Sequence, residues 1–298
     1  MAKVMNAQDT EALDVTIVLP AYNEEEAIVK VIDDIERAMA GSSHKYEILV
    51  VDDASSDETA KRAEEKGVRV ICRPIRQGSG ASRKTGILNA KGNVIVMLDA
   101  DGTYTAADIP NLLAHFPDFD QVNGARTSEQ GTMKILRTPA KWLIRQFACY
   151  LTGTKIPDLN TGLKAFKKDI MMKYLWVMPN GFSCVTSMTL AFLVNGHRVK
   201  YIPTAYHPRI GKSKFHPFND AVNYIKTVIR MVMYFDPLKV FLPLGGILLL
   251  AGILKSILSF VYTHSLQESD VIILISAIVV FALGLLADLI VAYQKQGR

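Results

Sequence analysis

The chain has 298 residues, of which 49% are hydrophobic and 21% are charged, and its net charge at pH 7 is +5. This length allows one large domain or two smaller units, and the charge is too weak to indicate a nucleic-acid-binding protein by itself. The three cysteines lie far apart and match no metal-ligand spacing, so we expect reduced thiols in a cytosolic compartment. The first 14 residues lack the apolar core of a signal peptide, which predicts that the following domain is not exported by that route.

Short apolar runs alternate with amphipathic segments from residue 15 to about residue 122. The hydrophobic periodicity predicts strands at 15–20, 46–53, 68–73, 94–99 and 119–126, with helices at 24–40, 56–67, 80–92 and 106–116. This alternation indicates a doubly wound α/β fold with a mostly parallel sheet. The strands are nearly continuous runs of Val, Ile and Leu, as expected for strands buried on both faces.

Two later segments, at about 133–154 and 216–237, mix bulky apolar residues with basic ones. Helices of this composition can lie in the headgroup plane of a bilayer, although they can also pack on the sheet. We weigh the two interpretations evenly for the first segment. For the second we favour an interfacial amphipathic helix, because strongly apolar sequence follows it directly.

That apolar sequence contains two runs, at about 238–262 and 271–293, each long enough to cross about 30 Å of hydrocarbon as a helix. We predict a two-helix transmembrane hairpin, since a buried helical pair in a soluble protein fits these lengths poorly. The loop between the runs is acidic and the outer flanks are basic, so the positive-inside rule places the large domain and the C-terminus in the cytoplasm. Small residues in the first run can support association, which makes a homo-oligomer a further expectation. They are Gly245, Gly246 and Gly252.

Polar side chains follow three of the predicted strands, where the strands end. They are Pro20, Asn23 and Glu24 after the first strand, Asp52 and Asp53 after the second, and Asp99 and Asp101 after the fourth. Each alone would be interpreted as a helix cap or a loop acid, but ligands of open α/β sheets bind at this edge. No glycine-rich phosphate loop follows the first strand. We therefore expect a hard divalent cation, held by a carboxylate, to meet the charge of a substrate diphosphate.

Three segments carry a family resemblance, namely VVDDASSDETA (50–60), LDADGTY (98–104) and DLNTGLKAFKKD (158–169). With them the chain resembles inverting family 2 glycosyltransferases of the GT-A fold, most closely the dolichol-phosphate-mannose-synthase-like, or polyprenyl-phosphate glycosyltransferase, branch. The resemblance covers essentially the whole chain. It implies a cytoplasmic GT-A catalytic domain in residues 1–215, an interfacial helix in 216–237 and a membrane hairpin in 238–298.

The resemblance also implies roles for individual residues. The nucleotide would be bordered by Pro20, Tyr22, Asn23, Glu24, Asp52, Asp53 and Asp99, with Asp57 nearby. The metal, Mg²⁺ or Mn²⁺, would be held by Asp99 and Asp101. The acceptor phosphate would be held by Arg126, Arg137 and Lys141. The catalytic set would be Asp99, Asp101, Arg126, Arg137 and Asp158, with Thr161 and Gly162 beneath the sugar.

Two positions depart from the pattern of this branch. Thr103 stands where the mannosyl enzymes commonly have a metal-binding Gln, which weakens any assignment of a third protein ligand or of mannose. Thr186 and Ser187 stand where many relatives have a carboxylate, so we assign no general base there.

A basic stretch at 207–217 precedes the interfacial segment and contains Arg209, Lys212 and Lys214. It could be a solvated positive loop near anionic lipid. We favour a mobile lid that closes over the nucleotide sugar and contributes these cations to its diphosphate.

Together these features predict transfer of one sugar from a UDP- or GDP-linked donor to a polyprenyl phosphate, undecaprenyl or dolichyl, at the cytoplasmic membrane face. A lipid phosphate monoester is largely dianionic at neutral pH, so it needs little help from a general base. Two alternatives stay open: transfer to another lipid such as diacylglycerol, and a non-catalytic membrane partner of an active transferase.

Overall fold

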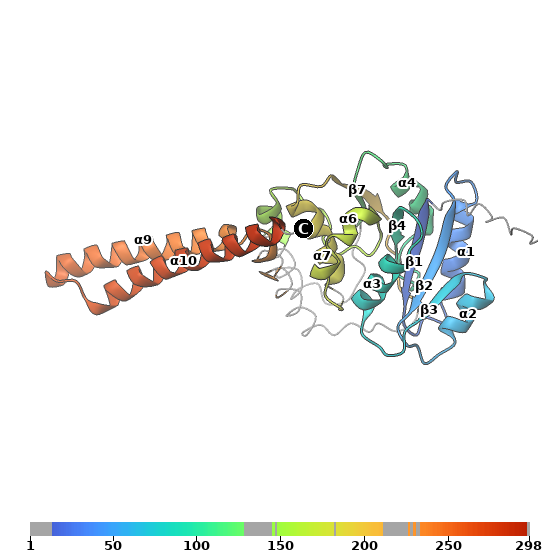
Figure 1. The fold of residues 1–298 in the computed structure, drawn as a ribbon, viewed down its shortest axis with the longest axis horizontal. Helices are drawn as coiled ribbons and strands as arrows, with labels where there is room; N and C mark the ends of the chain where they lie inside the picture. Colours follow the sequence, from blue (N-terminus) through green and yellow to red (C-terminus); the bar gives the residue numbers. More distant parts are fainter. Residues whose placement is uncertain are drawn as a thin grey trace, which may run out of the picture.

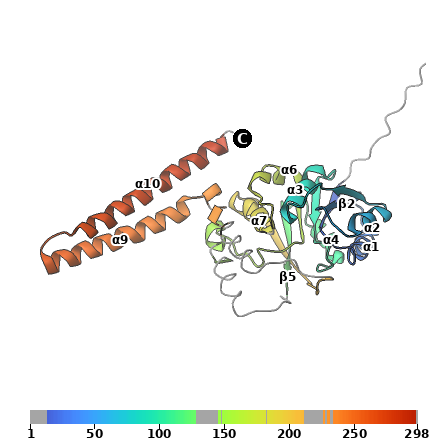
Figure 2. The same cartoon turned by 90° about the horizontal axis from the view of Figure 1, so that it is seen from below.

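The computed structural model describes residues 14–127, 145–146, 148–181, 183–210, 226, 229–230 and 233–296. It consists of an α/β domain and a long helical hairpin that projects from the side of the domain where α7 lies (Figures 1 and 2). The predicted fold class is confirmed.

Seven strands form one sheet in the order β3-β2-β1-β4-β6-β5-β7. They are β1 (Val15–Ala21), β2 (Tyr46–Asp52), β3 (Arg69–Cys72), β4 (Val94–Met97), β5 (Gln121–Arg126), β6 (Lys164–Lys167) and β7 (Val199–Thr204). The strands β1 to β4 pair in parallel, as do β5 and β7, whereas β6 runs antiparallel to both its neighbours. The sheet is therefore mostly parallel, as predicted, and β6 and β7 are the two strands that the periodicity did not indicate.

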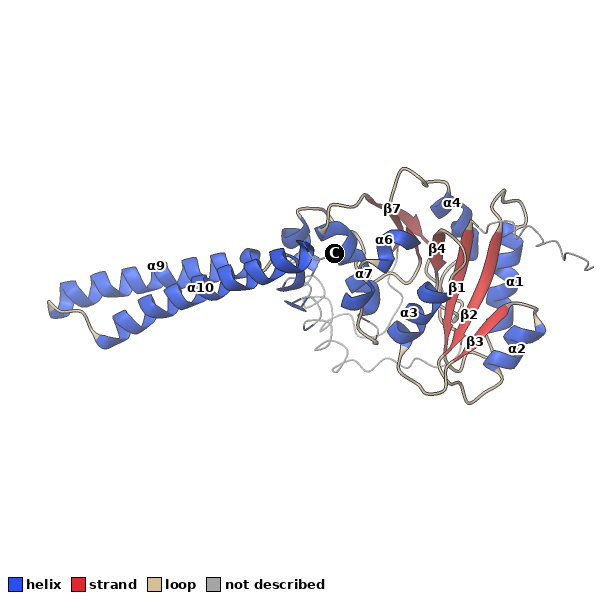
Figure 3. Ribbon diagram, in the orientation of Figure 1, coloured by secondary structure: helices blue, strands red, loops and turns tan. Residues whose placement is uncertain are grey.

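Helices cover both faces of the sheet (Figure 3), and the side chains of β1 alternate between the two apolar cores on these faces. Ile17 and Leu19 lie in one apolar core with Ile32, and Val18 lies in the other with Ile87. Because successive side chains of a strand point to opposite faces, β1 is buried on both sides. The helices are α1 (Ile28–Met39), α2 (Thr59–Glu65), α3 (Ser79–Asn89), α4 (Ile109–Leu113), α6 (Lys168–Met172) and α7 (Cys184–Val194), with short 3₁₀ turns η1 (Ala106–Asp108) and η2 (Leu175–Val177).

The hairpin consists of α9 (Leu238–Thr263) and α10 (Glu268–Gln296), close to the predicted runs at 238–262 and 271–293. Both helices are long and apolar enough to cross a membrane, and only 11% and 17% of their most apolar windows are buried. A protein-facing core helix would be mostly buried, so these exposed helices suit a bilayer.

Glycines bring the two helices of the hairpin together. A Cβ on Gly245 would lie 2.7 Å from Phe281, and one on Gly252 would lie 2.8 Å from Leu274. These two glycines thus let the two helices of one chain pack closely, and these contacts give no support to association between chains. A Cβ on Gly246 would meet no other side chain or segment among the described residues within 4 Å. The homo-oligomer stays a prediction without support.

The base of the hairpin is attached to the α/β domain. Lys239 donates from Nζ to the carbonyl oxygen of Leu151 at 2.6 Å, and Phe235 is buried in a third apolar cluster with Leu190 of α7. Most of the segments 133–154 and 216–237 lies outside the described residues, although residues 148–152 and 233–235 are helical. The hairpin therefore continues from a helical turn that packs against α7.

Candidate active site

The loops after β1 and β2 are joined by hydrogen bonds at the carboxyl edge of the sheet. The backbone N–H of Asn23 donates to Ser55 Oγ at 2.9 Å, and Ser56 N donates to Asn23 Oδ1 at 2.8 Å. Glu24 N donates to Thr59 Oγ1 at 2.8 Å. The predicted helix start at residue 24 is wrong, because residues 25–27 form a turn in which the N–H groups of Ala27 and Ile28 donate to the carbonyl oxygen of Glu24 at 3.0 and 2.9 Å, and α1 begins at Ile28.

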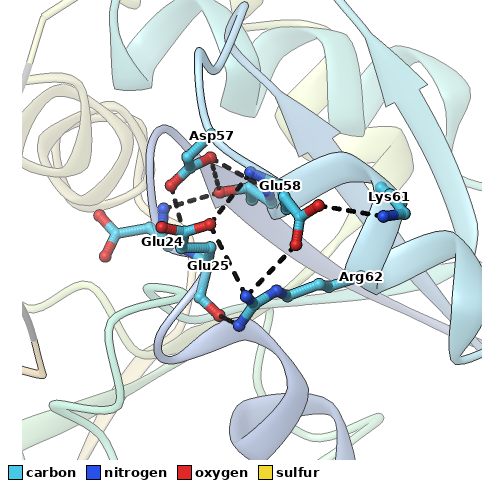
Figure 4. Close-up of polar contacts among 7 residues, drawn as sticks. Glu24, Glu25, Asp57, Glu58, Lys61 and Arg62 are labelled. Carbon is cyan, nitrogen blue, oxygen red and sulfur yellow. Dashed lines mark hydrogen bonds and ion pairs between the residues drawn. The ribbon is translucent and has the colours of Figure 1, made fainter.

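A second set of contacts lies behind these loops (Figure 4). Asp57 Oδ2 accepts from the backbone N–H of Glu25 at 3.3 Å, and Arg62 Nη1 donates to the carbonyl oxygen of Glu25 at 3.0 Å. Burial works to raise the pKa of Asp57, but its hydrogen bonds with Thr59 and Glu25 outweigh burial and lower it. Asp57 therefore stays ionised and holds the β1 loop in place.

Asp52 and Asp53 are buried and bonded to neighbouring loops. Asp52 Oδ2 accepts from Ser55 N at 2.9 Å. Asp53 accepts from the backbone N–H groups of Gln77 at 3.1 Å and Gly78 at 2.7 Å, and it pairs with Arg73 at 3.2 Å. Asp53 thus fixes the turn that leads into α3. Two further residues expected at the nucleotide are Pro20, which lies in β1, and Tyr22. The Arg76 guanidinium lies over the Tyr22 ring, 4.0 Å from the ring centre.

Asp99 and Asp101 lie just beyond the end of β4 and have different partners. Asp99 pairs with the buried guanidinium of Arg83. Asp101 accepts at Oδ1 from Thr103, from the backbone N–H at 3.1 Å and from the hydroxyl at 2.6 Å. Its other oxygen, Oδ2, lies 3.5 Å from Arg209 Nη1. Thr103 therefore orients the Asp101 carboxylate.

The two carboxylates influence each other. Burial and the charge of Asp99 raise the pKa of Asp101, while its bonds with Thr103 and the charge of Arg209 act in the opposite direction. A buried carboxylate beside a second one is stabilised by added positive charge. The site thus favours a cation at Asp101.

Residues 158–163, which connect into β6, form the floor of the site. Gly162 donates its N–H to the hydroxyl of the buried Tyr104 at 2.7 Å. A Cβ on Gly162 would lie 2.4 Å from Asp99 Oδ2, so only glycine fits against the carboxylate. Thr161 is fully buried beside it.

Arg126 and Asp158 form a two-bond ion pair at the end of β5. Arg126 donates from Nε to Asp158 Oδ2 at 2.7 Å and from Nη2 to Oδ1 at 2.9 Å. Burial works to raise the pKa of Asp158, but Arg126 outweighs burial and holds it below its usual range. The Arg126 guanidinium also lies over the Tyr206 ring at 5.2 Å. Asp158 is therefore ionised and orients Arg126.

Thr186, at the position where many relatives have a carboxylate, and four of the predicted site residues complete the account of the site. Thr186 of α7 donates to Asn160 Oδ1 at 2.6 Å, which joins the start of α7 to the floor. Four predicted residues lie outside the described residues: Arg137, Lys141, Lys212 and Lys214.

Sequence reasoning missed Arg83 and Tyr104. Arg83 lies in the first turns of α3, in the stretch GASRKTG, where a helical cation would be expected to point to solvent. Its buried ion pair depends on α3 packing over the end of β4, which no local pattern indicates. Tyr104 was part of a quoted motif, but its bond to Gly162 spans 58 residues.

The donor set fits a cation that arrives with a phosphate ligand. Among the described residues, no three His, Cys, Asp or Glu side chains come together as a metal site. Mg²⁺ is commonly held by one or two carboxylates plus substrate phosphates and water. Asp101, with Asp99 beside it, supplies that number of carboxylates.

Two family models match the chain. Residues 16–175, more than half of the chain, match "Glycosyl transferase family 2", and residues 236–293 match "GtrB C-terminal hairpin". The two matches correspond to the α/β domain and to the projecting helices, so each part of the fold is matched separately.

Similar curated proteins include two polyprenyl-phosphate sugar transferases. The dolichyl-phosphate hexose transferase of Haloferax volcanii is 29% identical over 74% of this chain and 94% of its own. The dodecaprenyl-phosphate galacturonate synthase of Rhizobium johnstonii is 24% identical over 94% of this chain and 88% of its own.

Among solved structures, glucosyl-3-phosphoglycerate synthase from Mycobacterium tuberculosis, crystallised with Mn²⁺, UDP-glucose and phosphoglyceric acid, superposes with a TM-score of 0.58. It is 18% identical, over 74% of this chain and 79% of its own, and at this identity it supports the fold alone. The sheet, its carboxyl-edge acids and the two family matches agree with the predicted resemblance, and the chain belongs to glycosyl transferase family 2 as a glycosyltransferase with a C-terminal membrane hairpin.

Proposed function

We propose that this enzyme transfers a single sugar from a UDP- or GDP-linked donor to a polyprenyl phosphate at the cytoplasmic membrane face, with inversion. Relatives named for transfer to dolichyl and dodecaprenyl phosphate support the acceptor class. The observation that carries the proposal is a site in which oriented acids and an oriented cation meet at one sheet edge. Asp101 is oriented by Thr103, and Arg126 is oriented by Asp158.

The donor would bind over the loops after β1, β2 and β4. Its nucleotide would lie against Pro20, Tyr22, Asn23, Glu24, Asp52, Asp53 and Asp99. A Mg²⁺ or Mn²⁺ ion held by Asp101 and Asp99 would neutralise charge on the departing nucleoside diphosphate. Asp99 pairs with the buried guanidinium of Arg83, whereas the contact of Asp101 with Arg209 is longer, at 3.5 Å, so Asp101 is the stronger candidate for the ion.

The acceptor phosphate would be held by Arg126, Arg137 and Lys141. An oxygen of the lipid phosphate forms a bond to the anomeric carbon, the bond from that carbon to the diphosphate breaks, and the electron pair leaves with the nucleoside diphosphate. The nucleophile is already an anion, so the protein has to place one anion beside another, and cations do this work. Asp158 keeps Arg126 oriented for that task.

The proposed organisation keeps the bounds predicted from the sequence, and the two family matches fall within its first and last parts, apart from the first two residues of the hairpin match. Residues 1–215 would be the catalytic domain, 216–237 an interfacial helix and 238–298 the hairpin, with Lys212 and Lys214 joining Arg209 in a lid over the donor. The apolar, exposed α9 and α10 support a membrane protein with two spans.

Asp101→Asn tests the proposal. We expect UDP- and GDP-sugars, screened against a polyprenyl phosphate in detergent with Mg²⁺ or Mn²⁺, to give a product in which sugar and lipid are joined through one phosphate. Asp101→Asn should lower the rate of product formation by roughly 10²- to 10³-fold, the usual effect of losing one oriented charge-stabilising group.

Mild acid separates the alternatives, because a sugar-phosphate-lipid is labile and a neutral glycolipid is not. A mild-acid-stable product would indicate another lipid acceptor. Full activity of Asp101→Asn would remove Asp101 from the site, and absence of any product would favour a non-catalytic partner.

A further inference from the structure

The segment after β7 folds back across the acidic motif. His207 donates its N–H to the carbonyl oxygen of Thr103 at 2.8 Å, and Ile210 donates to that of Asp101 at 3.1 Å. Tyr206 forms an antiparallel bridge with Tyr104, and their rings meet edge to face at 5.2 Å. This pairing fixes residues 206–210 directly over the end of β4.

Within this segment, Arg209 lies between acids from two other elements. Its guanidinium pairs with Glu24, after β1, and lies 3.5 Å from Asp101 Oδ2, after β4. The Glu24 contact joins residues 185 positions apart in the sequence. Arg209 thus supplies the positive charge that the buried Asp101 carboxylate favours.

Arg209 lies beside the Asp101 oxygen that a metal ion would bind. Thr103 already bonds Asp101 Oδ1 twice, so Oδ2, the oxygen that faces Arg209, is the one best able to take a new ligand. Two positive groups cannot share one carboxylate oxygen without strong repulsion. A divalent cation and Arg209 therefore compete for Asp101.

Arg209 also has an unused donor. Its Nε is buried and has no hydrogen-bond partner among the described residues. A buried guanidinium N–H without a partner costs free energy, and a diphosphate offers several acceptor oxygens. The guanidinium is suited to bind phosphate with two parallel bonds once it leaves the acids.

We propose that Arg209 is an exchangeable counter-ion of the donor site: it neutralises Asp101 and Glu24 in the unloaded enzyme and passes to the donor diphosphate when a divalent cation binds Asp101. This rests on the proposed function for the identity of the donor. The exchange couples cation and nucleotide binding, because the group that the cation displaces becomes a ligand for the diphosphate.

Direct binding measurements on the full-length protein in detergent test the exchange. In Arg209→Gln we expect the Kd for Mn²⁺ without nucleotide, measured by electron paramagnetic resonance, to fall about tenfold, because the competing charge is gone. The Kd for UDP or GDP in the presence of Mn²⁺ should rise by a similar factor in the same variant. Arg209→Lys, which keeps a cation there, should return the Mn²⁺ affinity toward that of the wild type.

Arg62→Gln is the matched control. Arg62 also lies by the β1 and β2 loops and removing it changes the net charge equally, but it contacts Glu25 and Glu58 and not Asp101 (Figure 4). Its Mn²⁺ affinity should equal that of the wild type. An equal gain in Arg62→Gln, or an unchanged or weaker Mn²⁺ affinity in Arg209→Gln, would overturn the exchange. An absence of sugar transfer with these opposite shifts intact would count against the proposed function and leave the exchange standing.

Discussion

The acidic side chains of this site form ion pairs with arginines from distant parts of the sequence. Asp99 pairs with Arg83, Asp101 and Glu24 with Arg209, and Asp158 with Arg126. Unpaired charge at these depths would be costly. The pairs therefore orient the acids before any ligand binds, which is what the proposed transfer between two anions requires.

Lys164 of β6 is a buried cation of a different kind. It is fully buried and donates from Nζ to the carbonyl oxygen of Val185 at 2.8 Å and to Thr189 Oγ1 at 3.0 Å. Burial lowers its pKa from the ordinary 10.5 to about 7, with the positive charge of Arg83 acting in the same direction. Both of these acceptors are neutral, and no carboxylate among the described residues bonds Lys164.

The low pKa of Lys164 predicts a pH-dependent stability. Between about pH 7 and 10.5 the unfolded chain binds more protons at this residue than the folded one, so its contribution to the free energy of unfolding rises with pH. Lys164→Met should remove that contribution, and its Tm, measured in detergent, should rise less from pH 7 to pH 9 than the wild-type Tm. Lys91→Met, at an exposed lysine, should follow the wild type. An equal change in Tm between pH 7 and pH 9 for all three proteins would contradict the low pKa of Lys164.

At the scale of elements, periodicity predicted the first five strands and the helices between them, because each is a local apolar pattern. It did not predict β6, a four-residue antiparallel strand inside the motif DLNTGLKAFKKD, or β7. The predicted strand at 94–99 ends at Met97, and Asp99 lies beyond it in a loop.

The acids of the site were found because they follow strands. Their partners Arg83 and Arg209 were not assigned to them, because those pairs exist only after distant elements pack.

The packing of α3 shows how an element delivers such a partner. A Cβ on Gly80 would lie 2.1 Å from the carbonyl oxygen of Pro179, so glycine lets the first turn of α3 approach residues 179–181 closely. This approach sets the position of Arg83, one turn further along α3, against Asp99.

Gly80→Ala should therefore destabilise the domain by about 1–3 kcal/mol, the usual cost of overpacking, and lower the Tm by several degrees. Gly41→Ala is the control, since a Cβ there meets nothing within 4 Å. Differential scanning calorimetry of both variants in detergent measures the effect. Equal Tm values for the two would mean that the α3 contact yields without cost.

At the scale of the whole molecule, the hairpin determines how the site meets the membrane. The 26 residues of α9 extend about 39 Å as a helix, more than the roughly 30 Å of hydrocarbon. Lys255 of α9 pairs with the buried Asp270 of α10 at 2.6 Å, close to the turn. The two helices are antiparallel, so the C-terminal end of α10 returns to the end of the hairpin that is nearer the α/β domain (Figure 2). In a two-span hairpin, the C-terminus and the domain would then share one side of the membrane.

The basic flank at Lys239 and the acidic turn predict that this side is the cytoplasm. Cys72 is exposed on the α/β domain, and Ser265 lies in the turn. A membrane-impermeant maleimide should label Cys72 in inverted vesicles and not in right-side-out vesicles. Because burial and the nearby Asp52 raise the pKa of the Cys72 thiol, labelling is best done at mildly alkaline pH. In a Cys72→Ser background, Ser265→Cys should show the reverse pattern. Labelling of Cys72 from the outside would place the catalytic domain on the opposite face, away from a cytoplasmic pool of nucleotide sugar.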